Sequence, residues 1–398
     1  MEFSKRAKKM KASAIGELLR QSGGSTCISF AGGLPDENLF PDNDLAQAMA
    51  TVFAEKSKSV LQYGDFQGVA ELRDFIGKKR MGEKFGLSVP ADQILITTGS
   101  QQGIDVVSRA YLNPGDVVLI ESPSYVDALN VFTSYGAVLK EIPSDEKGML
   151  PDELERILRE DKKVKLIYVI PDFQNPTGKT WSLERRRAFV ELIEQYDIPV
   201  IEDNPYGELH FDGPVLPSLA SLNQLQQVLF LGSFSKILSP GIRIGWVCAG
   251  PDTLHVLSLC KEATDIHCVN MTQEMIVAYV KRHDLNAHIE YMCGVYKKRR
   301  DAMVQAVRKY FPSGTTFSVP GGGFFLWVVL PEKLNATKAL PEVMARFVLY
   351  VPGAVFYPST GAENTLRLNF SNCDEVTIEK GIHILGDIFN SKLCIDNV

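Results

Sequence analysis

The sequence has no apolar run long enough to cross a membrane. Its longest uninterrupted apolar stretch is residues 324–330, whereas a membrane-spanning helix needs about 18 such residues or more. It also has no excess of positive charge, because 42 lysines and arginines face 48 aspartates and glutamates and leave a net charge of −6. That balance offers no electrostatic attraction for nucleic acid or an anionic membrane. We therefore predict neither a membrane nor a nucleic acid as a partner.

Cysteines are few and scattered. The seven of them include no Cys-x-x-Cys pair, which excludes a disulfide framework and the common zinc motifs. His283, His288 and Cys293 follow one another at five-residue intervals, a spacing that suits no metal site. The basic residues 5–11 lack the apolar segment of a secretory signal; a solvated helix explains them, with a mitochondrial presequence as the alternative. We predict reduced thiols, no bound metal and a cytoplasmic location.

The 398 residues suffice for two or three domains of ordinary size. Between residues 93 and 248, short β-rich runs alternate with amphipathic stretches of helical length. Strands separated by helices predict βαβ units and a mostly parallel sheet that is covered on both faces. The predicted strands are 93–98, 116–121, 165–170, 198–202, 228–231 and 242–248, and the predicted helices are 101–112, 125–135, 151–160 and 182–196.

After residue 250 the pattern changes to that of an α+β module. It predicts two long helices, a strong strand, a further helix, two short strands and a last helix that ends near residue 389. These elements are expected at 253–282, 285–310, 324–330, 340–349, 350–356 and 365–369. We predict an N-terminal helix and arm over 1–40 that packs with the small domain, a large domain over 41–285 and a small domain over 286–398.

The most informative segment is residues 232–236, Gly-Ser-Phe-Ser-Lys, with Arg243 seven residues beyond the lysine. Hydroxyls together with a guanidinium suit a phosphate monoester dianion, since arginine offers a bidentate fork. A lysine beside such a site can form a Schiff base with an aldehyde once its amine is deprotonated. The alternative is a serine-rich turn with a surface lysine.

Two other loops follow strands of the same predicted sheet. One comes after the strand 165–170 and contains Asn175; the other ends the next strand and contains Asp203 and Tyr206. Ligands of such sheets gather at the carboxyl ends of the strands, so we expect these side chains to lie beside the lysine. Each loop alone is an ordinary Asn-Pro turn, but their succession indicates a site.

A fourth segment, residues 97–103, joins a strand end to a helix. Free N–H groups at the helix N-terminus, with the Ser100 and Gln101 side chains, form a cradle for a phosphate. The segment lacks the Gly-Lys-Ser/Thr of a nucleotide loop and the glycine spacing of a dinucleotide fold. The phosphate is therefore not expected to be that of ATP or NAD. Residues 321–323, Gly-Gly-Gly, lack that spacing too and are interpreted as a flexible entry to a strand.

These motifs, in this order, resemble the fold-type I, pyridoxal-phosphate-dependent aminotransferases of class I/II, and among them the 2-aminoadipate/kynurenine type. The resemblance runs from about residue 28 to 369. It implies an α/β fold, in which a large domain has a mostly parallel seven-stranded sheet between helices and a smaller domain is α+β. It also implies pyridoxal 5′-phosphate as the cofactor. An L-amino acid and a 2-oxo acid would then exchange an amino group by a ping-pong mechanism.

The resemblance implies a role for each motif residue. Lys236 would hold the cofactor through a Schiff base and then move the substrate proton. Asp203 would pair with the pyridine nitrogen and keep it protonated, so that the ring withdraws electrons. Asn175 and Tyr206 would hydrogen-bond the phenolic oxygen, and Tyr125 would stack on the ring as a third catalytic residue. The phosphate would be held by Ser100, Gln101, Ser233, Ser235 and Arg243.

The resemblance also implies residues for the substrate and for a second subunit. Arg367 would clamp the substrate α-carboxylate beside Asn175, although by itself it is an ordinary strand arginine. Gly33, in the sequence Gly-Gly-Leu-Pro, would bring a bare backbone close to the substrate. Tyr63 would reach the phosphate of the neighbouring subunit, which implies a homodimer with shared active sites.

The same resemblance predicts two special peptide bonds. We expect cis peptides at Ser122–Pro123 and Asn175–Pro176, because both motifs fold tightly against the cofactor. Trans bonds at both places would contradict this placement of the loops.

The first helix departs from the family pattern. Relatives that prefer acidic side chains can carry an arginine before the Gly-Gly-Leu-Pro loop, whereas this chain has Gly16 and Glu17 at that place. A distal carboxylate would then lack a bidentate partner or depend on Arg20. We therefore predict broad use of neutral, aliphatic or aromatic amino acids ahead of 2-aminoadipate. 2-Oxoglutarate is the expected amino-group acceptor only because it is the usual acceptor in this family.

Two other classes of function remain as alternatives. The same cofactor and lysine support a β-lyase, a decarboxylase or a cyclase, which differ in how the substrate is oriented. A transcriptional regulator with a sensor domain of this kind would need a DNA-binding module, and the roughly thirty residues before the Gly-Gly-Leu-Pro loop contain no helix-turn-helix pattern. A binding protein without activity is disfavoured, because the lysine, aspartate, asparagine, tyrosine and both arginines are present together.

Overall fold

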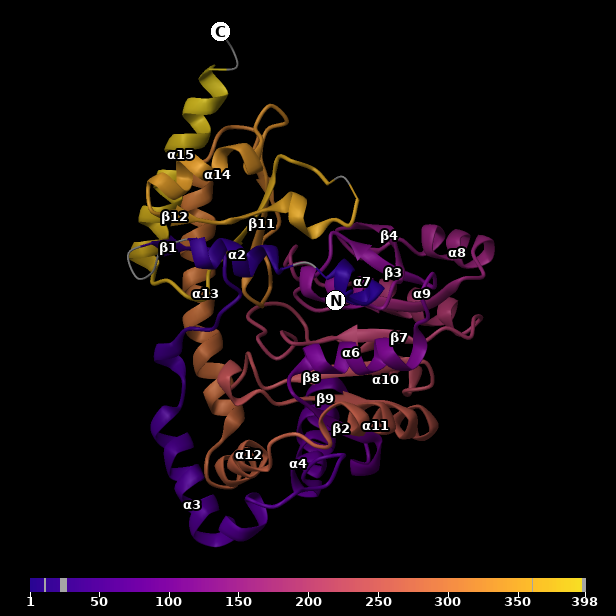
Figure 1. The fold of residues 1–398 in the computed structure, drawn as a ribbon. Helices are drawn as coiled ribbons and strands as arrows, with labels where there is room; N and C mark the ends of the chain where they lie inside the picture. The colour runs from indigo at the N-terminus through magenta and orange to yellow at the C-terminus, as the bar shows by residue number, and fades with distance from the viewer. Residues whose placement is uncertain (11, 22–26, 360, 396–398) are drawn as a thin grey trace.

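The computed structural model describes residues 1–10, 12–21, 27–359 and 361–395. An eight-stranded, mostly parallel β-sheet forms its centre (Figure 1). Its strand order is β2-β9-β8-β7-β6-β3-β4-β5. The strands from β8 to β4 run parallel, β9 is antiparallel to both neighbours, and β5 forms a hairpin with β4. The strands are β2 Ile94–Thr97, β3 Val117–Ser122, β4 Val138–Asp145, β5 Gly148–Met149, β6 Val164–Val169, β7 Val200–Asp203, β8 Val228–Ser233 and β9 Gly245–Cys248.

The predicted fold class is confirmed. The sheet has one strand more than the seven expected, and one of the seven is not among the strands predicted from the sequence pattern. The seven-stranded sheet corresponds to β2 through β4 in the order above, and the two-residue β5 extends its edge. Strand β4 escapes the pattern because charged side chains such as Lys140 and Glu141 interrupt it and most of its residues are at least partly exposed. Such a strand near a sheet edge carries little apolar signal.

The central strands are buried on both faces, as their unbroken apolar runs predict. Along β3, Val117 and Leu119 pack into one hydrophobic core, whereas Val118 and Ile120 pack into a second core on the other face. Successive side chains of a strand point to opposite faces, so an uninterrupted apolar run supplies both cores.

Helices cover both faces of this sheet (Figure 1). The four helices predicted between the strands are present close to their expected bounds. The helices of this part are α3 Asp42–Val60, α4 Ala70–Phe75, the π-helical Ile76–Gly82, α5 Glu83–Phe85, α6 Ser100–Tyr111, α7 Val126–Ser134, α8 Pro151–Glu160, α9 Leu183–Ile193, α10 Leu219–Asn223, α11 Pro251–Asp265 and α12 Asn270–Arg282.

The single long helix predicted over 253–282 is wrong, because the chain breaks between α11 and α12. Ile266 adopts a positive φ of 64°, which ends α11. Two contacts hold the break: the Gln102 side chain donates to Asp265 over 2.7 Å, and buried Cys268 lies 3.4 Å from the Thr98 hydroxyl. Both contacts join residues far apart in the sequence, so the helical periodicity of this one segment does not reveal the break.

A second, four-stranded antiparallel sheet of order β10-β11-β14-β13 organises the C-terminal part. Its strands are β10 Thr316–Phe317, β11 Phe325–Val329, β13 Val351–Pro352 and β14 Thr365–Asn369, and its helices are α13 Leu285–Tyr310, α14 Ala336–Ala345 and α15 Glu375–Ile395. Helix α14 begins and ends earlier than the predicted 340–349, because residues 348–349 form a strand, β12, that pairs with the N-terminal arm.

The N-terminal segment contacts both parts of the molecule. Strand β1 Ile28–Ser29 pairs in parallel with β12 Val348–Leu349. Helix α1 Lys5–Lys9 packs instead on α7, where the Arg6 guanidinium lies 4.6 Å from the centre of the Tyr135 ring. It is followed by α2 Ala14–Gln21. The proposed domain boundaries near residues 40 and 285 stay predictions.

Several local features bear on the sequence predictions. Both predicted cis peptide bonds are present, at Ser122–Pro123 and Asn175–Pro176. No helix within the described ranges is long and apolar enough to span a membrane. Among those same residues, no three or more His, Cys, Asp or Glu side chains are grouped so as to hold a metal ion. The six cysteines whose side chains are described are free.

Candidate active site

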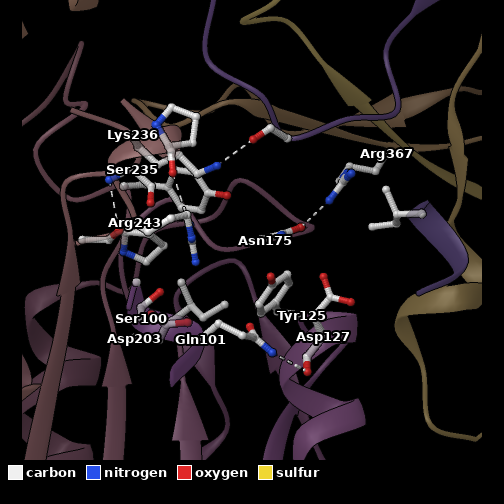
Figure 2. A pocket seen from close by; sticks show the side chains of 18 residues that line it. Ser100, Gln101, Tyr125, Asp127, Asn175, Asp203, Ser235, Lys236, Arg243 and Arg367 are labelled. Carbon is white, nitrogen blue, oxygen red and sulfur yellow. Dashed lines mark hydrogen bonds between the residues drawn. The ribbon is translucent and has the colours of Figure 1, made fainter. Parts of the chain in front are cut away.

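The loops that follow the central strands meet at a pocket of about 220 Å³ at the carboxyl edge of the large sheet (Figure 2). The pocket brings together every predicted site residue except Tyr63. The predicted residues that line it are Gly33, Ser100, Gln101, Tyr125, Asn175, Asp203, Tyr206, Ser233, Ser235, Lys236, Arg243 and Arg367. Ile15 and Asp127 also line it, and the sequence analysis singled out neither.

Lys236 lies in the turn after β8, and its amine points into this pocket. Its Nζ donates a hydrogen bond to the Gly33 carbonyl over 2.7 Å. Burial, together with the nearby Arg367 and Arg243 cations, lowers the pKa of Lys236 to about 8. A substantial fraction of the amine is therefore neutral, and thus nucleophilic, near physiological pH.

Asp203 ends β7 and, among the described residues that line the pocket, carries the one buried carboxylate oxygen without a partner. Its Oδ2 accepts a hydrogen bond from the Tyr168 hydroxyl over 2.8 Å, whereas the buried Oδ1 has no hydrogen-bond partner. Burial raises the pKa of Asp203 to about 6, against the lowering effect of the Tyr168 hydrogen bond. A buried oxygen left in this state calls for an N–H donor from a ligand. The Tyr168 contact went unnoticed in the sequence because the residue reads as part of an apolar strand.

Arg367 lies on β14, and its guanidinium is held at the opposite side of the pocket. It donates to the Asn175 side-chain oxygen over 2.7 Å and to the Ala31 carbonyl, and its buried Nε has no hydrogen-bond partner. The Phe325 ring centre lies 4.1 Å from the guanidinium carbon. Burial lowers the pKa of Arg367 to about 10, so the group stays charged at neutral pH. The arginine is therefore no solvated surface residue, which excludes the alternative left open for it.

An anion cradle lies at the start of α6. Gly99 has a φ of 74°, and Ser100 opens the helix, whose N-terminus has no side-chain cap. The Arg243 guanidinium lies beside them and donates to the Thr98 carbonyl over 3.1 Å. A Cβ on Gly245 would lie 2.6 Å from the Gly99 carbonyl carbon, so a glycine is needed where the strand passes this turn. Figure 2 shows Ser100, Ser235 and Arg243 on the same side of the pocket.

Aromatic side chains complete the pocket wall. Tyr206 is buried, with its ring edge-on to Phe324 and Phe325 at centre distances of 5.6 Å and 5.7 Å. Burial raises the pKa of the Tyr206 hydroxyl above its usual value, so it remains a neutral donor. Burial, and next the Asp127 carboxylate, raise the pKa of Tyr125 as well. Both hydroxyls are thus protonated throughout the physiological pH range.

Tyr63 does not belong to this pocket. It is 75% exposed and touches His267 edge-on at 5.8 Å. The neighbouring Gly64 N–H donates to Nε2 of the same histidine over 3.2 Å, which holds the loop in place. Its predicted role in a neighbouring subunit stays a prediction.

The helix that departs from the family pattern also reaches the pocket. Ile15 of α2 lines the pocket, whereas the neighbouring Gly16 packs near Ser13 and Arg20 is exposed. Among the described residues, Arg243 and Arg367 are the arginines that line the pocket.

Pyridoxal 5′-phosphate presents an aldehyde, a basic ring nitrogen and a phosphate monoester. The partly neutral lysine amine, the unpaired carboxylate oxygen and the helix N-terminus with its arginine match these three groups. The fold and the pocket together define a fold-type I enzyme that uses this cofactor.

The comparison with known proteins narrows that class. The model of the family "Aminotransferase class I and II" matches residues 26–385, and the chain belongs to this family. It is 38% identical to the aromatic-amino-acid aminotransferase 1 of Thermococcus litoralis, over 98% of this chain and 94% of the relative.

Solved structures agree. The kynurenine aminotransferase of Pyrococcus horikoshii, in complex with PMP, superimposes with a TM-score of 0.93 at 39% identity, covering 98% of this chain and 97% of the other. The α-aminoadipate aminotransferase of Thermus thermophilus, complexed with N-(5′-phosphopyridoxyl)-L-leucine, has a TM-score of 0.91 at 35% identity and covers 99% and 98%. The chain is thus a pyridoxal-phosphate aminotransferase of the aminoadipate/kynurenine type.

Proposed function

We propose that the protein transfers the amino group of neutral aromatic or aliphatic L-amino acids to a 2-oxo acid in two half-reactions at one pocket. The observation that carries this proposal is that, among the residues the structure describes, the pocket has two arginines and no third for a distal carboxylate. Arg243 and Arg367 line the pocket, and the cofactor phosphate and the substrate α-carboxylate would occupy both. Ile15 and Tyr125 offer apolar surface to the substrate side chain. A relative named for aromatic amino acids supports this range, and 2-oxoglutarate is the acceptor expected from the family.

The chain's own groups divide the work. Bound pyridoxal 5′-phosphate supplies an aldehyde and an electron-withdrawing ring. We assign to Lys236 the covalent hold on the cofactor and the transfer of the proton at the substrate Cα, because its amine is partly neutral. We assign to Asp203 the contact with the ring nitrogen of the cofactor, because its unpaired Oδ1 can accept a hydrogen bond from that nitrogen and keep it protonated. Asn175 and Tyr206 would hydrogen-bond the phenolic oxygen, and Tyr125 would stack on the ring.

The remaining assignments concern the cofactor phosphate, the substrate contact of Gly33 and the cellular location of the enzyme. The phosphate would be held by Ser100, Gln101, Ser233, Ser235 and Arg243, all of which line the pocket. Gly33 would meet the substrate through its backbone. The free cysteines support a cytoplasmic location.

Absorption spectroscopy tests the proposed function. Single L-amino acids are added, without any oxo acid, to the purified protein loaded with pyridoxal 5′-phosphate. The absorption of the aldehyde form should give way to that of the amine form, most readily with aromatic and aliphatic amino acids. A band that no amino acid changes would contradict amino transfer and favour a lyase or decarboxylase. Failure to bind the cofactor would contradict the assignment of Lys236.

Replacement of Arg367 by lysine should raise the KM for every amino acid on the order of 10-fold to 100-fold. The ammonium group cannot form the paired hydrogen bonds that a guanidinium offers to a carboxylate. Steady-state kinetics with one good donor measure the effect. The cofactor absorption of Arg367→Lys should match that of the wild type, which serves as the folding control. An unchanged KM would show that the α-carboxylate binds elsewhere.

We propose further that two chains form a homodimer in which Tyr63 of the partner subunit reaches the cofactor phosphate. Tyr63→Phe should then weaken cofactor binding on the order of 10-fold, since it removes a hydrogen bond to a charged group. Equilibrium titration of the cofactor-free protein gives the dissociation constant, and light scattering gives the mass. The matched control is Tyr291→Phe, which alters another exposed tyrosine, on α13. A monomer, or equal affinities for the two variants, would contradict shared sites.

A further inference from the structure

Asp127 places a carboxylate on the substrate side of the pocket. It is the second residue of α7 and follows Tyr125 by two positions. Figure 2 shows it beside Tyr125, on the side of the pocket away from Ser100 and Arg243. The anion cradle therefore lies at one side of the pocket and this acidic group at the other.

The Asp127 carboxylate acts on its neighbours in the pocket. Burial, and next the Asp127 carboxylate, raise the pKa of the Tyr125 hydroxyl, so this neighbour stays a neutral phenol. It therefore brings no positive charge to this side of the pocket. Arg367 lines the same pocket: burial lowers its pKa, and the Asp127 charge is among the groups that act against that lowering. In the proposed function that guanidinium is already taken by the substrate α-carboxylate.

Beyond Asp127 the pocket continues into a second cavity of about 460 Å³. Gln101, Tyr125, Asp127 and Arg243 line both spaces, so Asp127 lies at their junction. The outer cavity carries another carboxylate, Asp105, which accepts a hydrogen bond from the Tyr135 hydroxyl over 3.1 Å. Its other walls come from Met10, Ser13, Asn130, Val131 and Ser134. A long substrate side chain would pass Ile15 and the Tyr125 ring first and these acidic groups next, since in the proposed function the Arg243 guanidinium of the same cavity is paired with the cofactor phosphate.

We propose that Asp127 is a specificity-determining residue that disfavours substrates ending in a carboxylate. It favours side chains with an apolar or aromatic body and a hydrogen-bond donor or cation at the end. This inference rests on the proposed function and names its substrate class. Since donor and acceptor use one pocket in turn, the distal carboxylate of 2-oxoglutarate meets the same repulsion as that of glutamate. The expected acceptor is thereby a poorer substrate than a 2-oxo acid with an uncharged side chain.

Glutamate and glutamine test the inference, because they share a shape and differ by one charge. The measured quantity is the ratio of kcat/KM for glutamate to that for glutamine, in the wild type and in Asp127→Asn. The ratio should rise at least about 10-fold in the variant, since two like charges a few ångströms apart repel by more than 1 kcal/mol in a protein pocket. The KM for 2-oxoglutarate should fall by a similar factor relative to that for phenylpyruvate.

Asp152→Asn is the matched control. Asp152 is the second residue of α8, as Asp127 is of α7, and it is exposed. Its replacement removes the same charge from the same helical position, yet it should leave the ratio unchanged. An equal rise of the ratio in both variants would show that the net charge of the protein causes the effect and would contradict the proposal. An unchanged ratio in Asp127→Asn would also overturn it. If the wild type converts neither glutamine nor any neutral amino acid, the proposed function fails instead.

Binding of unreactive acids gives a second readout that does not depend on turnover. Glutarate and its monoamide glutaramate repeat the charge difference without an amino group. By calorimetry on the holoenzyme, the wild type should bind glutaramate more tightly, and Asp127→Asn should remove most of that preference. Equal preferences in both proteins would contradict a direct effect of the Asp127 charge on the ligand.

Discussion

Lys236→Ala should lower the rate of amino transfer on the order of 10³-fold or more, because the variant loses its nucleophile and proton carrier together. The structure makes this lysine suited to both tasks. Its Nζ lies against the Gly33 carbonyl inside the pocket, and its lowered pKa leaves part of the amine neutral. Single-turnover absorption measurements with one good amino acid give the rate.

Two controls separate chemistry from folding in this variant. Lys236→Ala should still bind pyridoxal 5′-phosphate through the phosphate cradle, but borohydride reduction should no longer attach it to the protein. A small added amine such as methylamine should restore part of the rate, since it can move the proton that the lysine moved. Retention of more than about a tenth of the wild-type rate would show that another group carries the proton.

Asp203→Asn should reduce the rate on the order of 10²-fold or more and weaken cofactor binding. The wild-type carboxylate has one buried oxygen, Oδ1, free to accept the proton of the ring nitrogen. An amide in its place carries no charge and no longer favours a protonated ring, and one pKa unit of such preference is worth about 1.4 kcal/mol. Stopped-flow half-reactions and cofactor titration measure the two effects.

Tyr168→Phe separates the effect of positioning the Asp203 carboxylate from the effect of removing it. The Tyr168 hydroxyl donates to Asp203 Oδ2 over 2.8 Å, so it positions the carboxylate. Its loss should slow the half-reaction only about 10-fold and should raise the pH at which activity declines on the acid side, because that hydrogen bond lowers the pKa of Asp203. If Tyr168→Phe were as damaging as Asp203→Asn, the hydrogen-bonded oxygen rather than the free one would be the important atom.

The site was largely predictable because its residues come directly after strands. In a parallel sheet all such loops meet at one edge, and Asn175, Asp203 and Lys236 follow three strands that are neighbours in the sheet. The order of strands in space was not needed for this conclusion. The type of chemistry followed from the residue types, since hydroxyls and arginine hold phosphate whereas a sheltered lysine attacks an aldehyde.

Other features could not be predicted, because they depend on contacts between distant residues. Tyr168 reads as a strand residue, and only the neighbouring β7 shows that its hydroxyl meets Asp203. At the break after α11, the Gln102 side chain donates to Asp265. The place of Asp127 in the pocket is defined by Ile15 and Arg367, which come from distant parts of the chain. Helical periodicity reports the buried face of one segment alone and contains nothing about its neighbours.

The sequence by itself determined the class of fold and nearly all of the residues that line the pocket, and its resemblance to a known family gave the cofactor. The fold and the pocket residues follow from local order along the chain: strand, loop, helix, and the chemical groups in each loop. The tertiary structure alone decided which groups are left charged, neutral or unpaired once buried, namely the lowered pKa of Lys236, the free oxygen of Asp203 and the acidic wall at Asp127. Burial and the distances between charges set those states, and both exist only after distant segments have packed together.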